Sequence, residues 1–203
     1  MKLLLLKLQF HVDDLESLQG ESPKRTIEYH QEIGNDFIVF PSLPDEELIN
    51  SADDYKRIAE QFNKLGGECK HNGVIFCYHN LAFEFKQFNG KTGFEILFEH
   101  TDPVLVKMQL DCFWIMYGGY NPIEVIEKYG ERVVSMHIKD MKRVDGKKRS
   151  IEFGLGELDI SRLMQVGDKY GVKWFIAEQE QFDGDPLDSA KFNIDRLTEI
   201  YRK

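Results

Sequence analysis

Short apolar stretches alternate along the chain with longer amphipathic segments. Six short stretches are expected to be strands, at residues 3–11, 37–40, 74–79, 104–111, 133–140 and 173–178. The segments between them are mostly expected to be helices, because they carry apolar residues at helical spacing and begin near Pro or end near Gly. Strands joined by helical crossovers run parallel, so the pattern predicts an α/β fold of about six βα units.

Two of the expected helices have a clear apolar face. The helix that ends near residues 72–73 should bury Tyr55, Ile58, Ala59, Phe62 and Leu65. The terminal helix, which starts at residues 185–186, should bury Leu187, Ala190, Ile194, Leu197 and Tyr201. Residues 142–149 interrupt this rhythm and are expected to be a basic loop.

A doubly wound sheet and a closed barrel both fit this order of elements. In the fourth stretch Lys107, Gln109 and Asp111 share one face, because successive side chains of a strand point to opposite sides. A strand with such a polar face favours a barrel, whose interior meets the ligand at the carboxyl ends of the strands.

Composition limits the classes of partner. The chain has 203 residues and no evident linker or repeat, so a single domain over residues 1–203 is expected. A net charge of −9 argues against nucleic-acid binding, which needs clustered Lys and Arg. Cys69, Cys77 and Cys112 lack metal-site spacing and an even count, and are expected to be reduced thiols of a cytoplasmic protein. The apolar opening at residues 1–7 is too short to span a bilayer, and no membrane partner is expected.

Polar side chains gather at the carboxyl ends of the expected strands, where α/β folds bind ligands. They are His11, His79, Asp111, His137, Lys139 and Glu178, with Glu84 just beyond the third strand. Carboxylates and imidazoles on separate rigid strands suit a divalent cation such as Mn²⁺, Mg²⁺, Co²⁺ or Zn²⁺. Such a cation can polarise a carbonyl group while a neighbouring base removes a proton.

Each of these residues also has a structural interpretation. Asp111 could cap a helix, Glu178 could be a solvated loop acid, and His11 could simply hold its strand in place. Trp114 could form part of the core or the wall of a pocket. The basic segment 142–149 is either a solvated loop or a cover for an anionic group of the substrate. Polar ends on four successive strands favour the functional interpretation of the set.

Five groups of residues carry a family resemblance. They are 78–80 with 83–85, 109–111 with Trp114, His137-Ile138-Lys139-Asp140, 154–157 with Asp159, and Ala177-Glu178-Gln179-Glu180. In this order they resemble the sugar phosphate isomerase/epimerase family, the xylose isomerase-like TIM barrels. The resemblance implies a (β/α)8 barrel with a divalent metal ion at the mouth formed by the carboxyl ends of its strands.

The resemblance also implies roles for single residues. Asp111, His137 and Glu178 match metal-ligand positions, and Lys139 matches a polar position beside the metal. His79 falls on the strand where ketose epimerases carry a Glu that is both ligand and base. The catalytic candidates are therefore Glu178, His79 and Lys139, and the candidates for substrate binding are His11, Glu84 and Trp114.

The chain departs from the family in three places. It has Tyr78 and His79 where the Glu is expected, Leu81 where the subgroup usually has a His, and Trp114 where epimerases have a second His. It also supplies six βα units where the family has eight, so the first two strands are expected to be missing. We expect either an N-terminally shortened barrel or one that another chain completes, as in a homo-oligomer.

The expected function is that of a metal-dependent isomerase or epimerase of a sugar or keto-sugar. A base, Glu178 or His79, would remove the proton next to the carbonyl to give a metal-stabilised enediolate, and Lys139 would stabilise the negative charge. Two alternatives remain open: a keto-sugar hydratase or lyase that uses the same metal site, and a carbohydrate-binding barrel without catalysis.

Overall fold

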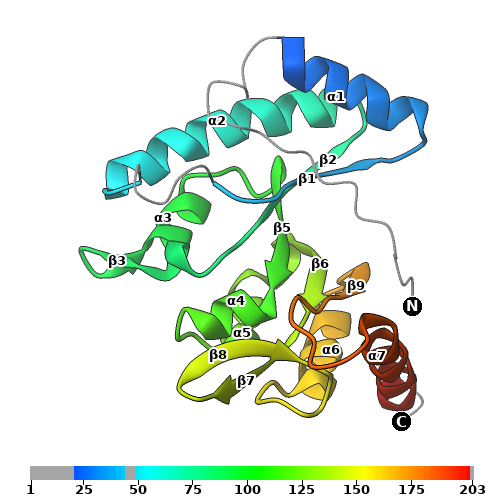
Figure 1. Cartoon of the computed structure of the whole chain (residues 1–203). Helices are drawn as coiled ribbons and strands as arrows, with labels where there is room; N and C mark the ends of the chain where they lie inside the picture. The colour runs from blue at the N-terminus through cyan, green and yellow to red at the C-terminus, as the bar shows by residue number, and fades with distance from the viewer. Residues whose placement is uncertain (1–20, 44–48, 202–203) are drawn as a thin grey trace. The chain divides into compact units, whose positions relative to one another are not determined.

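The computed structural model describes residues 21–43 and 49–201 of the 203-residue chain. The expected first strand, at residues 3–11, and with it His11, lies outside the described residues. The described chain forms two compact units that divide between Gln109 and Leu110, here called the N-terminal and C-terminal units (Figure 1). The single domain expected from composition stays a prediction.

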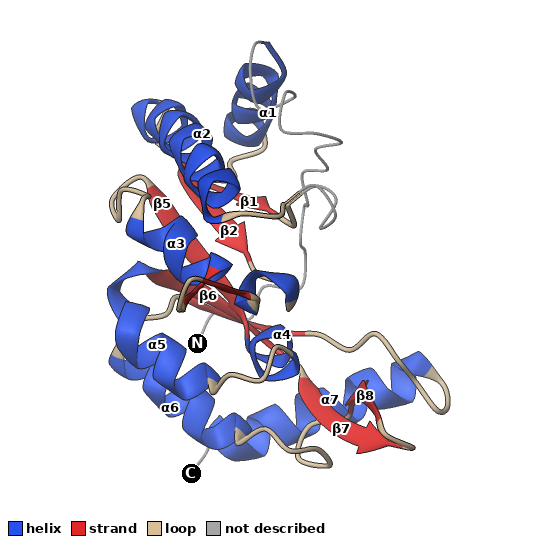
Figure 2. Cartoon of the chain, turned by 90° about the vertical axis from the view of Figure 1, so that its left-hand side faces the viewer, coloured by secondary structure: helices blue, strands red, loops and turns tan. Residues whose placement is uncertain are grey.

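The N-terminal unit is built on three parallel strands in the order β1-β2-β5. Its elements are α1 (Glu21–Glu32), β1 (Phe37–Phe40), α2 (Ala52–His71), β2 (Ile75–His79), the 3₁₀ helix η3 (Phe83–Phe85), β3 (Gln87–Phe88), β4 (Lys91–Thr92), α3 (Gly93–Glu99) and most of β5 (Val106–Asp111). Figures 1 and 2 show α1 and α2 lying side by side over β1 and β2.

Helix α2 follows the sequence prediction closely. A capping box of Ser51 and Asp54 begins it, and all five apolar residues predicted for its inner face are buried. The helix continues through Gly66, which lies against the backbone of Leu105. Only glycine fits at this position, because an added Cβ would be 2.5 Å from the Leu105 carbonyl oxygen. Phe62 packs against the rings of Phe40 and Phe76 at centroid distances of 5.2 and 5.4 Å, so aromatic contacts fix the helix on the strands.

The C-terminal unit begins with the last two residues of β5 and contains the parallel pair β6–β9. Its elements are α4 (Cys112–Tyr117), α5 (Pro122–Tyr129), the 3₁₀ helix η4 (Gly130–Arg132), β6 (Val133–Ile138), β7 (Asp140–Val144), β8 (Lys147–Ile151), α6 (Ile160–Lys169), β9 (Trp174–Ala177) and α7 (Pro186–Tyr201). Every residue of β6 is buried, and its register sets His137 opposite Ile176 of β9.

The basic segment 142–149 is not a loop, contrary to the sequence prediction. It belongs to an antiparallel hairpin in which β7 pairs with β8 and Val144 faces Lys147. Asp145 and Gly146 form its turn with φ of 50° and 77°, which is the left-handed backbone that Asp-Gly turns adopt. The turn chemistry therefore outweighs the charged, weakly strand-forming side chains on both sides of it.

Helix α7 also differs from its prediction. Leu187 is 76% exposed and Ile194 is 41% exposed, and of the predicted inner residues with described burial only Leu197 is buried. The inner face instead carries Ser189 and Asn193, which are buried at 7% and 5% exposure. Their side chains hydrogen-bond to polar groups beside β8, so polar contacts and not an apolar stripe orient this helix.

The described strands β1, β2, β5, β6 and β9 alternate with helices, as in a TIM-barrel-type fold. The predicted fold class, the (β/α)8 TIM-barrel type, is confirmed. The predicted number of βα units stays a prediction, because residues 3–11 lie outside the described part of the chain. All three cysteines are buried and lie outside disulfide bonds. No helix among the described residues combines the length and apolar character that crossing a membrane requires.

Candidate functional site

Asp111 is the last residue of β5, and its side chain forms part of the candidate site. Its Oδ1 accepts a hydrogen bond of 3.0 Å from the backbone N–H of Trp114, which makes it the N-cap of α4. The side chain is fully buried. Burial raises the pKa of its carboxyl group above the ordinary value, although Lys139 and His137 act in the opposite direction.

His137 lies in β6, and Glu178 directly follows the neighbouring strand β9. The His137 Nδ1 lies 2.5 Å from Glu178 Oε2 and 3.9 Å from Asp111 Oδ2. The imidazole is 1% exposed, whereas the Glu178 side chain is 32% exposed. The backbone N–H of Glu178 donates to the carbonyl oxygen of Ile138 at 3.1 Å, which holds the end of β9 against β6. Glu178 is thus the member of the group most open to a ligand.

Lys139 places a buried positive charge among three carboxylates. Its Nζ lies 2.8 Å from Glu180 Oε1, 3.3 Å from Asp111 Oδ2 and 3.6 Å from Glu178 Oε2. Burial lowers the pKa of this amine, but the three carboxylates outweigh burial and leave the pKa above its ordinary value. Lys139 is therefore held as an ammonium ion.

Two aromatic rings lie next to the ammonium group of Lys139. The Nζ lies 4.9 Å from the ring centroid of Phe113 and 5.1 Å from that of Trp114. Both rings belong to α4, the short helix that Asp111 caps. Trp114 thus lies beside the charged amine, and its predicted role in substrate binding stays a prediction.

Asp140 fixes the segment that follows the site. Its two carboxylate oxygens accept backbone hydrogen bonds from Met141, Gly154, Gly156 and Leu158, at 2.8 to 3.1 Å. Gly156 has no room for a side chain, since an added Cβ would be 2.3 Å from Asp140 Oδ1. Asp140 thus connects the end of β6 to the loop before α6. Lys139 is held in place because it lies between the last residue of β6 and Asp140.

The structure brings together Asp111, His137, Lys139, Glu178 and Trp114, all within the C-terminal unit. It adds Glu180, which the sequence analysis did not assign to the site. The signal was present, because Glu178 and Glu180 are two residues apart in an extended segment and so share one side of the chain.

His79 and Glu84 belong to the N-terminal unit. The His79 Nδ1 lies 3.1 Å from Gln109 Oε1, and both side chains are buried. Glu84 is fully buried and accepts hydrogen bonds from the Tyr78 hydroxyl and, at 3.0 Å, from the backbone N–H of Leu81. Glu84 therefore holds the loop after β2, and the substrate-binding and catalytic roles of these two residues stay predictions.

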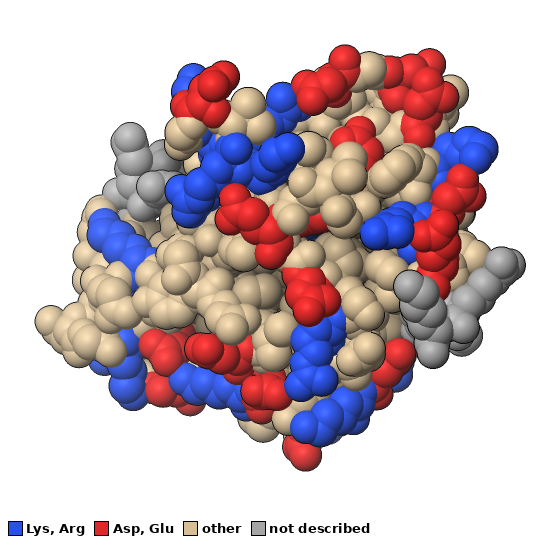
Figure 3. Space-filling model, turned by 90° about the horizontal axis from the view of Figure 1, so that it is seen from below, with Lys and Arg blue, Asp and Glu red and all other residues tan. Residues whose placement is uncertain are grey.

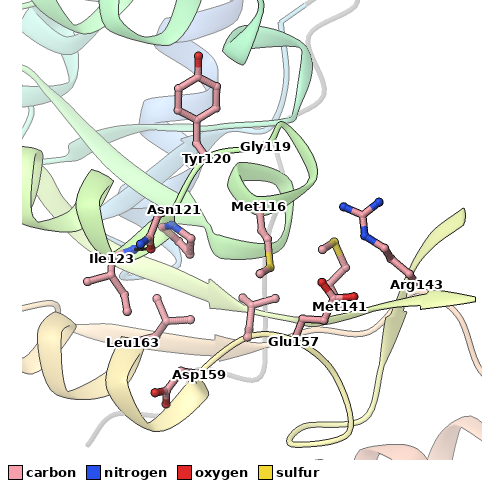
Figure 4. Close-up of a pocket in the computed structure, with 12 residues that line it drawn as sticks. Met116, Gly119, Tyr120, Asn121, Ile123, Met141, Arg143, Glu157, Asp159 and Leu163 are labelled. Carbon is pink, nitrogen blue, oxygen red and sulfur yellow. Dashed lines mark hydrogen bonds between the residues drawn. The ribbon is translucent and has the colours of Figure 1, made fainter. Parts of the chain in front are cut away.

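A cavity of about 490 Å³ lies in the C-terminal unit, between α4, α5, β7 and the start of α6 (Figure 4). Its apolar lining includes Met116, Ile123, Met141 and Leu163. Figure 4 shows the Arg143 side chain extending from β7 on the side where Met116 and Gly119 lie. Arg143 thus lies at one edge of a space large enough for a small ligand.

The donor set of the site fits a divalent cation. Two carboxylates and one imidazole are the ligands that Mn²⁺, Mg²⁺, Co²⁺ and Zn²⁺ accept, and the donor atoms of Asp111 and Glu178 lie within 3.9 Å of His137 Nδ1. The nearby Cys112 is no competing thiolate, because burial raises the pKa of its thiol well above the ordinary value. Asp111, His137 and Glu178 could therefore share one ion.

Residues 17–200 match the family described as xylose isomerase-like TIM barrel. This chain belongs to that family. The match covers both units and all the residues of the site described above. The predicted resemblance is thereby confirmed.

Among curated proteins, the chain is 30% identical over 166 residues to an inosose dehydratase of Clostridium perfringens, covering 72% of this chain and 54% of that protein. It is 26% identical over 145 residues to an inosose dehydratase of Clostridium beijerinckii, covering 64% and 48%. The chain thus spans about half the length of the curated relatives it matches.

Solved structures have a similar fold. A sugar phosphate isomerase/epimerase from Parabacteroides distasonis matches with a TM-score of 0.79 and 25% identity, over 94% of this chain and 68% of that one. A xylose isomerase-like TIM barrel protein from Mycobacterium smegmatis in complex with magnesium matches with a TM-score of 0.67 and 14% identity, over 88% and 65%. At that identity the second likeness is one of fold alone.

Proposed function

We propose that this chain belongs to a divalent-metal-dependent enzyme that removes a proton next to the carbonyl group of a sugar or keto-sugar. The observation that carries the proposal is the cluster of the buried Asp111, His137 and Lys139 with the partly exposed Glu178. It combines a metal-type donor set with a fixed positive charge, and enolising a carbonyl compound needs both a base and a group that stabilises negative charge.

A bound cation would polarise the substrate oxygens and stabilise negative charge on them. Asp111 and His137 are held rigidly by α4 and β6 and serve to position it. Glu178 is the candidate base, because its carboxylate is the most exposed of the three donors and can meet a substrate proton. Lys139 would attract the oxygen that becomes negative, since its ammonium group is fixed on three sides by carboxylates.

His79 is proposed as a further ligand or second base. Its Nδ1 lies 3.1 Å from Gln109 Oε1, and both side chains are buried within the N-terminal unit. The hydrogen bond to Gln109 would fix the orientation of the ring, which is how metal-binding and proton-transferring imidazoles are usually held.

The two candidate reactions share this first step. An isomerase or epimerase returns the proton to a neighbouring carbon or to the other face of the same carbon. A dehydratase instead expels a hydroxyl group, which leaves as water once protonated. The curated relatives named inosose dehydratase favour dehydration as the second candidate.

The metal site is tested by elemental analysis of the purified protein after incubation with Mn²⁺ and removal of unbound metal. We expect bound metal in the wild type and at least a tenfold loss in His137→Ala. His71→Ala is the matched control, because it removes an exposed histidine at the end of α2. Equal metal content in wild type and His137→Ala would remove His137 from the ligand set.

The reaction is tested in D₂O with ketohexoses and with inosose, followed by NMR spectroscopy. Incorporation of deuterium next to the carbonyl, without loss of water, supports an isomerase or epimerase. Loss of a hydroxyl group from the ring supports a dehydratase. Saturable sugar binding with no exchange under any metal condition would overturn the enzymatic proposal and favour a carbohydrate-binding barrel.

A further inference from the structure

The β7–β8 hairpin carries a small pocket that the proposed reaction does not use. Its volume is about 380 Å³, and its lining residues are Tyr117, Arg143, Gly146, Lys147 and Lys148. Three of the five are cationic and none is acidic. The acid of the hairpin turn, Asp145, does not line the pocket. This lining contrasts with the net charge of −9 of the chain, and the face shown in Figure 3 carries both acidic and cationic side chains.

The hairpin register brings like charges together. Arg143 lies directly opposite Lys148 in the ladder, and like charges in such cross-strand pairs are destabilising. Among the described residues, no acidic group pairs with Arg143 or Lys147. Arg149 provides the contrast, because its guanidinium group forms an ion pair of 2.7 Å with Asp183. A bound anion would offset the repulsion between Arg143 and Lys148.

One of the three cations is already fixed in place. The Lys148 Nζ donates to the carbonyl oxygen of Tyr117 at 2.5 Å and lies 4.8 Å from the centroid of the Tyr117 ring. A lysine held in this way loses little further conformational freedom when it binds a ligand. Arg143 adds a planar group with several N–H donors, which suits the paired oxygens of a phosphate or carboxylate.

We propose that Arg143, Lys147 and Lys148 form a binding site for an oxyanion carried by a small ligand. The shared chemistry is that of a phosphate monoester or a carboxylate. The charge of the three side chains favours the phosphate dianion in particular.

The pocket is joined to the candidate active site by aromatic contacts within the C-terminal unit. The Trp114 ring lies 5.1 Å from Lys139 Nζ and 5.3 Å from the Tyr117 ring, and Tyr117 in turn holds Lys148. An elongated substrate could therefore place its reacting carbon near Lys139 and its anionic end at the hairpin. This part of the inference rests on the proposed function, whereas oxyanion binding itself does not.

Oxyanion binding is tested by calorimetric titration of the full chain with inorganic phosphate at constant ionic strength. We expect saturable binding that weakens about tenfold in Arg143→Gln or Lys147→Gln. The matched control is Lys142→Gln, which removes the same charge from the same hairpin but does not line the pocket. Far-UV circular dichroism and the thermal midpoint establish that each variant is folded. No saturable binding, or an equal loss in Lys142→Gln, would overturn the proposal.

The source of the oxyanion is tested by comparing phosphate with acetate in the same titration. Stronger binding of phosphate supports a phosphate monoester, and stronger binding of acetate supports a carboxylate. In the D₂O assay, a ketose phosphate should then have a lower KM than the free ketose. Lys147→Gln, which lines the hairpin pocket but not the larger cavity, should raise that KM while leaving the KM of the free ketose unchanged. If no sugar exchanges deuterium but phosphate still binds at the hairpin, the proposed function fails and the oxyanion site stands.

Discussion

Asp111 and Asp140 are both fully buried in the C-terminal unit, but they have different surroundings. Asp140 accepts hydrogen bonds from four backbone N–H groups, which cannot move away from it. Asp111 accepts a backbone hydrogen bond from Trp114 and faces the charged or titratable side chains of His137, Lys139 and Glu178. Backbone donors fix a carboxylate in one state, whereas side chains can rearrange around a ligand.

The pKa of Asp111 reflects its side-chain surroundings. Burial raises the pKa of its carboxyl group, and the positive charge of Lys139 only partly reverses this shift. A buried carboxylate whose charge is not fully compensated is costly for folding, and such groups gather at functional sites. Asp140 therefore has the surroundings of a framework residue, whereas the proposed function gives Asp111 a role in metal binding. Mutations of Asp140 should therefore mainly lower the free energy of unfolding, and mutations of Asp111 should mainly lower metal binding.

The largest expected effect on stability is that of Asp140→Ala. It leaves four N–H groups without their acceptor, two of them in buried and two in part-buried hydrogen bonds, and we expect the free energy of unfolding to fall by about 3 to 5 kcal/mol. Urea denaturation followed by circular dichroism measures the loss. Asp183→Ala is the control, because Asp183 is 77% exposed and its ion pair with Arg149 should contribute less than about 1 kcal/mol.

The next largest effect is that of Gly156→Ala, which tests the same contact from the other side. The added methyl group would lie 2.3 Å from Asp140 Oδ1 and 2.5 Å from the carbonyl oxygen of Met141. Overpacking of this kind should lower the free energy of unfolding by about 2 to 3 kcal/mol. Gly67→Ala should instead raise stability by about 0.5 to 1 kcal/mol, because it lies inside α2 with open space around it. A harmless Gly156→Ala would mean that the loop is not held tightly by Asp140.

These residues also show how far sequence reasoning reached. Alternation along the fifth strand placed His137 and Lys139 on one face, and parallel pairing of neighbouring strands brought Glu178 beside them. The grouping of these three side chains was predictable, because it depends only on strand periodicity and on the order of the strands along the chain. The framework role of Asp140 was not, because the four N–H groups that it binds come from its own neighbour and from a loop about fifteen residues away.

The spacing of apolar residues did not predict three features of the fold. Helix α4 consists only of apolar and aromatic residues and starts because Asp111 caps it. The β7–β8 hairpin forms from strongly basic strands around an Asp-Gly turn. Helix α7 turns Ser189 and Asn193 inward because their partners lie beside β8, so its apolar residues misled the prediction of the buried face.

A smaller effect is expected at the contact between α7 and β8. The Ser189 hydroxyl donates to Glu152 Oε1 at 2.5 Å, and this hydrogen bond is the main reason that the pKa of Glu152 lies below its ordinary value of 4.5. Ser189→Ala should lower the free energy of unfolding by about 1 kcal/mol at neutral pH.

The stabilising effect of the Ser189–Glu152 hydrogen bond should depend on pH. Because the pKa of Glu152 is lowered in the folded protein, its contribution is fully present above pH 4.5 and is lost as the pH falls through the folded pKa. The difference in stability between wild type and Ser189→Ala should therefore shrink in acid. Urea denaturation over a series of acidic pH values measures it. A difference that stays constant with pH would show that Ser189 acts through packing and not through the charge of Glu152.

The smallest effect on stability is expected at Asp111. In Asp111→Asn the amide oxygen can still cap α4, Lys139 keeps Glu178 and Glu180 as partners, and a costly buried charge is removed. The free energy of unfolding should change by less than about 1 kcal/mol, while metal binding falls at least tenfold. Asp140→Asn is the matched variant: its amide group turns N–H donors toward backbone N–H donors and should cost about 3 kcal/mol. Equal destabilisation by the two substitutions would mean that Asp111, like Asp140, is a structural residue, and the candidate site would then lose the carboxylate that links β5 to His137 and Lys139.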